Sequence, residues 1–131
     1  IGGQPIDLGR IAQPLYSVAA QDDHIAPWQQ VFRTLRHISA DKRFVLSSSG
    51  HILGIINPPV DPPKRSHRAS AAQCGDEAQA WLARTESAPD SWWPDWMKWL
   101  KPRSGRRTQA LPLATDDFPA LDPAPGRYVL E

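Results

Sequence analysis

Two short apolar segments, separated by an amphipathic stretch, form the main pattern in the first half of the chain. Residues 15–20 (Leu-Tyr-Ser-Val-Ala-Ala) are nearly all apolar or small, which is typical of a strand covered on both faces. Residues 42–48 contain the second segment, in which Phe44, Val45 and Leu46 predict another buried strand. A polar or glycine-containing loop follows each of the two predicted strands.

The stretch between these strands has the spacing of a helix. Pro27 or Trp28 opens it, because proline is tolerated in a first helical turn. The helix is expected to end near residues 39–40. Its buried face consists of Val31, Phe32, Leu35 and Ile38. Strand, helix and strand in this order predict a parallel pair joined by a right-handed crossover.

The middle of the chain gives a weaker pattern. Residues 52–56 fit either a short strand or a helical turn, and the pattern leaves both open. Residues 57–63 contain four prolines and are expected to form no regular element. Residues 64–75 are basic and small, which predicts an irregular surface loop.

Two short helices are predicted in the second half. Asp76 and Glu77 begin the first, which runs to Arg84 with charges that suit the helix dipole. Ser91 is the expected N-cap of the second, which runs to Leu100. One face of this second helix carries Trp92, Trp96 and Trp99. Such a face fits packing against the core better than a surface for an acyl chain.

These elements predict the α/β class. Two strands alone make a marginal sheet, and a parallel sheet normally has helices on both faces. We therefore expect residues 1–101 to complete a larger α/β domain whose other strands lie outside this chain. Residues 102–131, rich in Pro and Arg, are expected to form a tail anchored near Phe118 or Tyr128. The start at Ile1 rather than Met also fits a piece of a longer protein.

Composition narrows the classes of function. With 131 residues and a formal net charge of +1, the chain lacks the clustered basic excess of a nucleic-acid-binding protein. No apolar run approaches the roughly 20 residues of a membrane span, and no signal-peptide pattern opens the chain. Cys74 is the single cysteine, so an internal disulfide is excluded and a reducing cytoplasm is expected.

An acid and an imidazole follow the two predicted strands. Asp23 comes shortly after the first strand, and His51 follows the second. The carboxyl ends of adjacent parallel strands meet at one edge of a sheet, where open α/β sheets hold their active sites. A carboxylate there can orient an imidazole that exchanges protons near neutral pH. Acid before histidine fits a hydrolase-type triad, although an ordinary loop acid and loop histidine fit the spacing equally well.

Neighbouring residues offer weaker alternatives. Asp22 is the competing acid, but it lies one residue nearer the strand, so its side chain is expected on the other side. His24 adjoins the acid and fits an exposed structural histidine better than a site residue. Cys74 follows His51 in a polar loop without the strand–turn–helix elbow of a nucleophile, which makes it a poor candidate. One cysteine and four scattered histidines show no zinc-ligand spacing, so no metal is expected.

Five motifs, taken together, are specific. They are Asp23-His24-Ile25-Ala26-Pro27-Trp28, Ser49-Gly50-His51-Ile52, Ile56-Asn57-Pro58-Pro59, Ser91-Trp92-Trp93-Pro94-Asp95-Trp96 and Pro125-Gly126-Arg127-Tyr128-Val129. In this order and spacing they resemble the polyhydroxyalkanoate synthases, most closely the class I, poly(3-hydroxybutyrate)-type enzymes. The likeness covers nearly the whole chain and departs from the family between residues 65 and 75.

This resemblance implies the C-terminal part of an α/β-hydrolase catalytic domain with a Cys–His–Asp triad. Asp23 matches the family's catalytic Asp and His51 its catalytic His, while the nucleophilic Cys lies upstream of this chain and Cys74 does not take its place. The implied reaction is an acyl transfer that polymerises (R)-3-hydroxyacyl-CoA into polyester with release of CoA and no separate cofactor. His24 and Ile52 are candidate substrate-binding residues.

The resemblance further implies a homodimer located in the cytoplasm at polyester granules. This chain alone is expected to be inactive, because it lacks the nucleophile. Two other interpretations stay open. An esterase with Ser in the upstream elbow would use the same Asp and His for hydrolysis. A non-catalytic module would bind granules or a partner through its tryptophan face, and Asp23 and His51 would then lie far apart.

Overall fold

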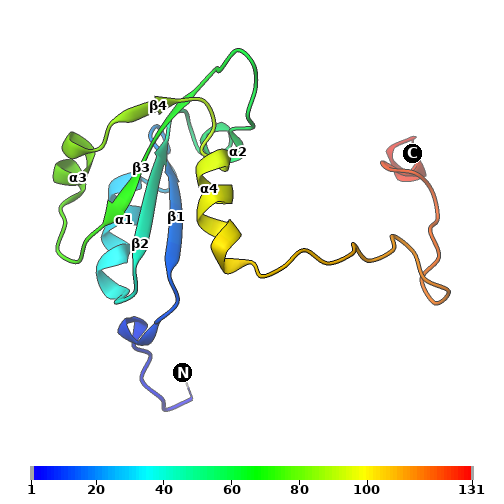
Figure 1. The fold of residues 1–131 in the computed structure, drawn as a ribbon, viewed down its shortest axis with the longest axis horizontal. Coiled ribbons are helices and arrows are strands. Elements are labelled where there is room, and N and C mark those ends of the chain that lie inside the picture. Colours follow the sequence, from blue (N-terminus) through cyan, green and yellow to red (C-terminus); the bar gives the residue numbers. More distant parts are fainter. Residues whose placement is uncertain (1, 131) are drawn as a thin grey trace.

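The parallel pair predicted from the sequence is present in the structure, a computed structural model that describes residues 2–130. Strand β1 (Leu15–Ala20) pairs in parallel with β2 (Lys42–Ser47), and helix α1 (Trp28–Thr34) lies in the crossover between them (Figure 1). The last turn tightens into the 3-10 helix η2 (Leu35–His37) and ends slightly before the predicted position. The crossover brings the ends of β1 and β2 side by side.

Residues 64–75 do not form the irregular loop that the sequence predicts. Strand β3 (Ser66–Ala72) runs antiparallel to β2 along its whole length, and β4 (Ser87–Pro89) adds to the far side of β3. Serine and alanine are weak strand formers, so their pattern does not mark β3. The strand forms because β2 presents a full row of backbone donors and acceptors that need partners. The sheet therefore has four strands rather than two, in the order β1-β2-β3-β4.

Helices cover both faces of this sheet (Figure 1). Helices α1 and α3 (Ala78–Arg84) pack on one face of the sheet. Successive side chains of a strand point to opposite faces, and Phe44 points to the face that α1 and α3 cover. The short α2 (Leu53–Ile56) and α4 (Trp93–Leu100) lie on the other. Helix α2 answers the open question at residues 52–56 in favour of a helical turn.

Both second-half helices begin slightly later than predicted. Helix α3 starts at Ala78, and the carboxylate of Asp76 accepts the backbone N–H of Gln73 (2.7 Å) instead of lying in the first turn. Helix α4 starts at Trp93, whose backbone N–H donates to the hydroxyl of Ser91 (3.1 Å). The N-cap of α4 is therefore Trp92 rather than the predicted Ser91, whose hydroxyl accepts the N–H of the first helical residue.

Aromatic side chains form the core between the sheet, α1 and α3. The ring of Phe44 contacts Phe32 and Trp81 at centroid distances of 5.0 and 4.9 Å, and Trp28 packs beside them. Phe44 and Trp81 are fully buried. Large rings dominate core energetics, so this cluster fixes α1 and α3 against the sheet and holds the ends of β1 and β2 in place.

The chain beyond α4 carries little regular structure. Two 3-10 turns, η3 (Lys101–Arg103) and η4 (Arg127–Leu130), are its only helical elements within the described residues. Figure 1 shows this segment leading away from the sheet. Phe118 and Tyr128 are 80% and 74% exposed, so the prediction that one of them anchors the tail is wrong. Within residues 2–130, no helix is long and apolar enough to cross a membrane.

Candidate active site

The loops that follow β1 and β2 are joined by backbone hydrogen bonds. The N–H of Gln21 donates to the carbonyl of Ser47 (2.8 Å), and that of Asp22 donates to the carbonyl of Ser49 (3.1 Å). Ser49 has a φ of +81°, a conformation that turns the chain sharply after the strand. This turn delivers His51 to the same sheet edge that holds the loop after β1.

Asp23 and His51 are hydrogen-bonded to each other. The Nδ1 atom of His51 lies 2.8 Å from Oδ2 of Asp23. The other carboxylate oxygen, Oδ1, accepts the backbone N–H groups of Ile25 (2.9 Å) and Ala26 (2.8 Å), so both oxygens are held. The Asp23 side chain is only 5% exposed, whereas that of His51 is 45% exposed. The acid is thus fixed behind an accessible imidazole.

Hydrogen bonds lower the pKa of Asp23. The backbone N–H of Ala26 is the largest cause, burial opposes it, and His51 and the N–H of Ile25 add to it. Asp23 is therefore an acceptor at neutral pH, and the proton of a neutral imidazole lies on Nδ1. The lone pair then lies on Nε2, the ring nitrogen that does not contact Asp23, which is the arrangement a general base needs.

The other candidate residues near this edge do not join the pair. Asp22 is exposed, and its recorded contact is through its backbone rather than its carboxylate. His24 and Ile52 flank the pair in sequence and are both exposed. Within residues 2–130, neither side chain has a recorded hydrogen bond or ring contact with Asp23 or His51. The contact thus distinguishes Asp23 from Asp22, while the roles of His24 and Ile52 stay predictions.

Two residues for which the sequence predicted no supporting role hold the loop of His51 in place. The amide of Asn57, 1% exposed, donates to the hydroxyl of Ser47 (2.9 Å) and so ties the end of α2 to the end of β2. Gly54 lies directly on β1 in a space that admits no side chain. The sequence offered two signals, Asn57 before two prolines and Gly54 inside an apolar run. Neither signal indicates a partner by itself.

Curated relatives match this chain along nearly its whole length. A poly(3-hydroxyalkanoate) polymerase 2 from Ectopseudomonas oleovorans is 40% identical over 129 residues, which cover 98% of this chain and 23% of that protein. A poly(3-hydroxyalkanoate) polymerase subunit PhaC from Cupriavidus necator is 41% identical over 128 residues, with 97% and 21% covered. The PhaC subunit from Rhizobium etli is 36% identical over 132 residues, with 100% and 20% covered.

Over nearly its whole length, the chain is similar to poly(3-hydroxyalkanoate) polymerases. The resemblance drawn from the sequence motifs is thereby confirmed. The chain spans about a fifth of the length of these relatives. A scan against protein-family models finds no match.

A second polar cluster joins α4 to the sheet. Asp95 accepts two hydrogen bonds from the guanidinium of Arg43 (2.7 and 2.5 Å) and one from the hydroxyl of Tyr16 (2.8 Å). Burial would raise the pKa of Asp95, but the hydrogen bonds from Arg43 and Tyr16 outweigh it and the pKa is lowered. Burial, followed by the contact with Asp95, raises the pKa of Tyr16. Asp95 is therefore an ionised acceptor that fixes α4.

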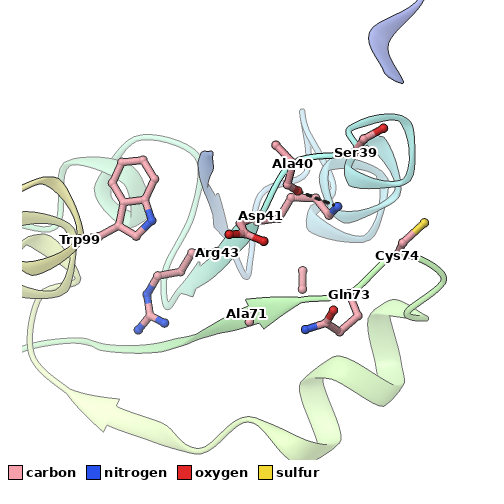
Figure 2. Close-up of a pocket in the computed structure, with 10 residues that line it drawn as sticks. Ser39, Ala40, Asp41, Arg43, Ala71, Gln73, Cys74 and Trp99 are labelled. Atoms are coloured by element: carbon pink, nitrogen blue, oxygen red, sulfur yellow. Dashed lines mark hydrogen bonds between the residues drawn. The ribbon is translucent and has the colours of Figure 1, made fainter. Parts of the chain in front are cut away.

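The single thiol lies at the opposite end of the sheet from His51. Cys74, Arg43 and Trp99 are among the residues that line a cavity of about 380 Å³, and Figure 2 shows how these side chains lie. It lies where β2 begins, because Ala72, two residues before Cys74, pairs with Lys42. The length of β2 therefore separates Cys74 from His51. Among residues 2–130, no three metal-binding side chains lie close enough together to hold an ion.

Proposed function

We propose that this chain is the C-terminal part of a poly(3-hydroxyalkanoate) polymerase with an α/β-hydrolase fold, and that it supplies two members of a Cys–His–Asp triad. His51 is the general base and Asp23 its orienting acid. The observation that carries the proposal is the 2.8 Å contact between Nδ1 of His51 and Oδ2 of Asp23 at the edge where two parallel strands end. Relatives that are 36–41% identical carry the polymerase name, which supports the same assignment.

The proposed reaction begins with proton transfer to Nε2 of His51 from a cysteine thiol outside this chain. The thiolate attacks the thioester carbonyl of an (R)-3-hydroxyacyl-CoA. The bond between the carbonyl carbon and the sulfur of CoA breaks, and the imidazolium returns the proton to the departing CoA thiolate. Asp23 stabilises the imidazolium through its short contact with Nδ1.

Elongation uses the same base on a different group. Nε2 of His51 takes the proton of a 3-hydroxyl group, and the resulting alkoxide character lets that oxygen attack an acyl–enzyme. An ester bond forms, the bond to the enzyme's sulfur breaks, and the imidazolium returns the proton to the freed thiolate. General-base assistance of this kind contributes about 10²–10⁴-fold to a rate.

Apolar side chains beside the triad pair support an acyl substrate. Ile25, Ile52 and Leu53 are 65%, 64% and 53% exposed, and they flank Asp23 and His51 in the chain. Exposed aliphatic groups next to a base suit an acyl chain better than a charged or strongly hydrated substrate. We include Ile52 among the proposed substrate-binding residues, together with His24, which follows Asp23 in the chain.

The proposal extends to the setting of the enzyme. We propose that residues 1–101 belong to the catalytic domain and residues 102–131 to a separate tail, and that the enzyme is a homodimer in the cytoplasm at polyester granules. The names of the relatives support a poly(3-hydroxyalkanoate) as the product. Light scattering of the purified full-length polypeptide and microscopy of a fluorescent fusion test these points. The 131-residue chain alone is expected to release no CoA.

The decisive experiment replaces the proposed base in the full-length polypeptide that carries this chain. We expect His51→Gln to abolish release of CoA and formation of polymer from 3-hydroxybutyryl-CoA, with the fold retained by circular dichroism. His37→Gln is the matched control, because His37 is an exposed histidine in η2, within the crossover. Near-normal polymer yield in His51→Gln would refute the role of His51.

A further inference from the structure

Two tryptophans at the start of α4, its N-cap Trp92 and its first residue Trp93, donate hydrogen bonds to the end of α2. The indole N–H of Trp92 donates to the carbonyl of Ile55 (3.1 Å), and that of Trp93 donates to the carbonyl of Ile56 (2.7 Å). The last carbonyls of a helix have no partner within the helix, so external donors are needed there. The Trp93 residue is 40% exposed, yet the indole N–H, the only polar group of its side chain, is directed at this helix end. Packing alone does not require that direction.

Helix α4 is itself fixed to the sheet, so these donors are held in place. Asp95 lies between the tryptophans and the rest of α4 and accepts hydrogen bonds from Arg43 on β2 and Tyr16 on β1. The ring of Tyr16 also contacts Trp92, at a centroid distance of 6.3 Å. The indole N–H groups therefore project from an element with its own ion pair to the strands that precede Asp23 and His51.

Helix α2 in turn continues the loop that carries His51. The N–H of Gly54 donates to the carbonyl of Gly50 (2.8 Å), which closes a turn around His51. The N–H of Ile56 donates to the carbonyl of Ile52 (2.9 Å) and continues that turn into α2. Gly54 contacts Ala20 at the end of β1. A displacement of α2 would therefore move the backbone on which the imidazole of His51 is mounted.

We propose that Trp93, assisted by Trp92, is a positioning residue for His51. Its indole N–H holds the last turn of α2. Helix α2 in turn holds the loop in the position that lets Nδ1 of His51 contact Oδ2 of Asp23 and directs Nε2 towards the reacting thiol. The catalytic consequence rests on the proposed function, but the anchoring of α2 does not. Errors of about 1 Å at a reacting group cost roughly 10²-fold in rate, so a small displacement is sufficient for a measurable effect.

The test compares Trp93→Phe with Trp96→Phe in the full-length polypeptide. Trp96 lies on the same helix and its ring contacts Trp93, but within residues 2–130 its N–H has no recorded acceptor. Both variants lose ring size, and Trp93→Phe alone loses a recorded hydrogen bond. The first measurement is hydrogen exchange of the backbone amides of residues 54–57. We expect exchange about tenfold faster in Trp93→Phe than in Trp96→Phe, the effect of losing one hydrogen bond.

The second measurement is single-turnover release of CoA from 3-hydroxybutyryl-CoA. A merely structural role would lower the amplitude, because fewer molecules are folded, and leave the rate constant unchanged. Positioning through His51 lowers the rate constant about tenfold with the amplitude retained. Trp96→Phe is expected to stay within about twofold of the wild type in both quantities.

The outcomes separate the two proposals. Faster exchange together with a lower rate constant supports positioning by Trp93. Unchanged exchange, or faster exchange with an unchanged rate constant, overturns it. A wild-type polypeptide that releases no CoA overturns the proposed function, and the exchange measurement then decides by itself whether Trp93 anchors α2. Trp92→Phe, assayed in the same way, is expected to add to the exchange effect.

Discussion

Gly54 and Ala20 meet so closely that a Cβ atom on Gly54 would lie 2.5 Å from the Cβ of Ala20. The same atom would lie 3.1 Å from the carbonyl oxygens of Ser48 and Ser49. Ala20 is fully buried at the end of β1, so the surroundings have no room to yield. The missing side chain of Gly54 therefore lets α2 rest directly on the strand end, next to His51.

Replacement of this glycine is expected to disturb both stability and activity. We predict that Gly54→Ala lowers the free energy of unfolding by about 1–3 kcal/mol, the usual range for overpacking. It should also lower polymer formation, because α2 must move away from Ala20. Gly50→Ala is the control, since a Cβ at Gly50 would meet only the carbonyl of Asp22, at 3.7 Å. Equal effects in the two variants, measured by denaturant unfolding and CoA release, would contradict the prediction.

The two neighbouring acids give a second matched pair. We predict that Asp23→Asn lowers turnover about 10³–10⁴-fold, because the amide can stabilise the wrong imidazole tautomer and carries no charge to balance an imidazolium. Asp22→Asn should remain within about twofold of the wild type, because the Asp22 side chain is exposed and does not contact His51. Steady-state release of CoA measures both. A larger loss in Asp22→Asn than in Asp23→Asn would show that Asp22, and not Asp23, orients His51.

The contact between Asp95 and Arg43 should make stability depend on pH. The pKa of Asp95 is lowered in the folded state, so its ionised form stabilises the fold above the unfolded pKa of about 4 and this contribution is lost as the pH falls below it. We predict that Asp95→Asn costs about 1–2 kcal/mol at pH 7, with a difference from wild type that shrinks below pH 4.

Urea unfolding at pH 7 and pH 3.5 checks this expectation. Asp117→Asn serves as the control, because Asp117 is exposed in the tail and has no recorded ion pair within residues 2–130. Its difference from wild type should be small at both pH values. If Asp95→Asn instead destabilised the protein equally at both, the lowered pKa of Asp95 would not be the source of the effect.

Sequence pattern predicted the parts of the fold that depend on large apolar side chains. β1, β2 and the crossover α1 follow from runs such as Phe44-Val45-Leu46, whose burial any sheet would require. The meeting of Asp23 and His51 followed from that topology, because adjacent parallel strands end at one edge. Their catalytic roles came from the family resemblance and stay predictions.

Tertiary contacts determine the parts of the fold that the sequence pattern did not predict. β3 consists mainly of serine and alanine, with one histidine and one arginine, and it is fixed by pairing with β2 and by contacts such as that of the Arg68 guanidinium with the carbonyl of Thr85. No local property of residues 66–72 encodes those partners. The support of His51 was missed for the same reason, since Trp92 and Trp93 each lie 37 residues along the chain from the carbonyl that they bind.

The buried bond between Asn57 and Ser47 permits a double-mutant test of how the loop of His51 is supported. Asn57→Ala and Ser47→Ala should each cost about 1–3 kcal/mol, since each leaves a buried polar partner unsatisfied. Asn57 has a φ of +25°, so its replacement by alanine carries an added backbone cost. The double variant should be less destabilised than the sum of the two by about 1 kcal/mol, because the bond can be lost only once. Strict additivity in denaturant unfolding would mean that this bond does not connect β2 to the end of α2 in solution.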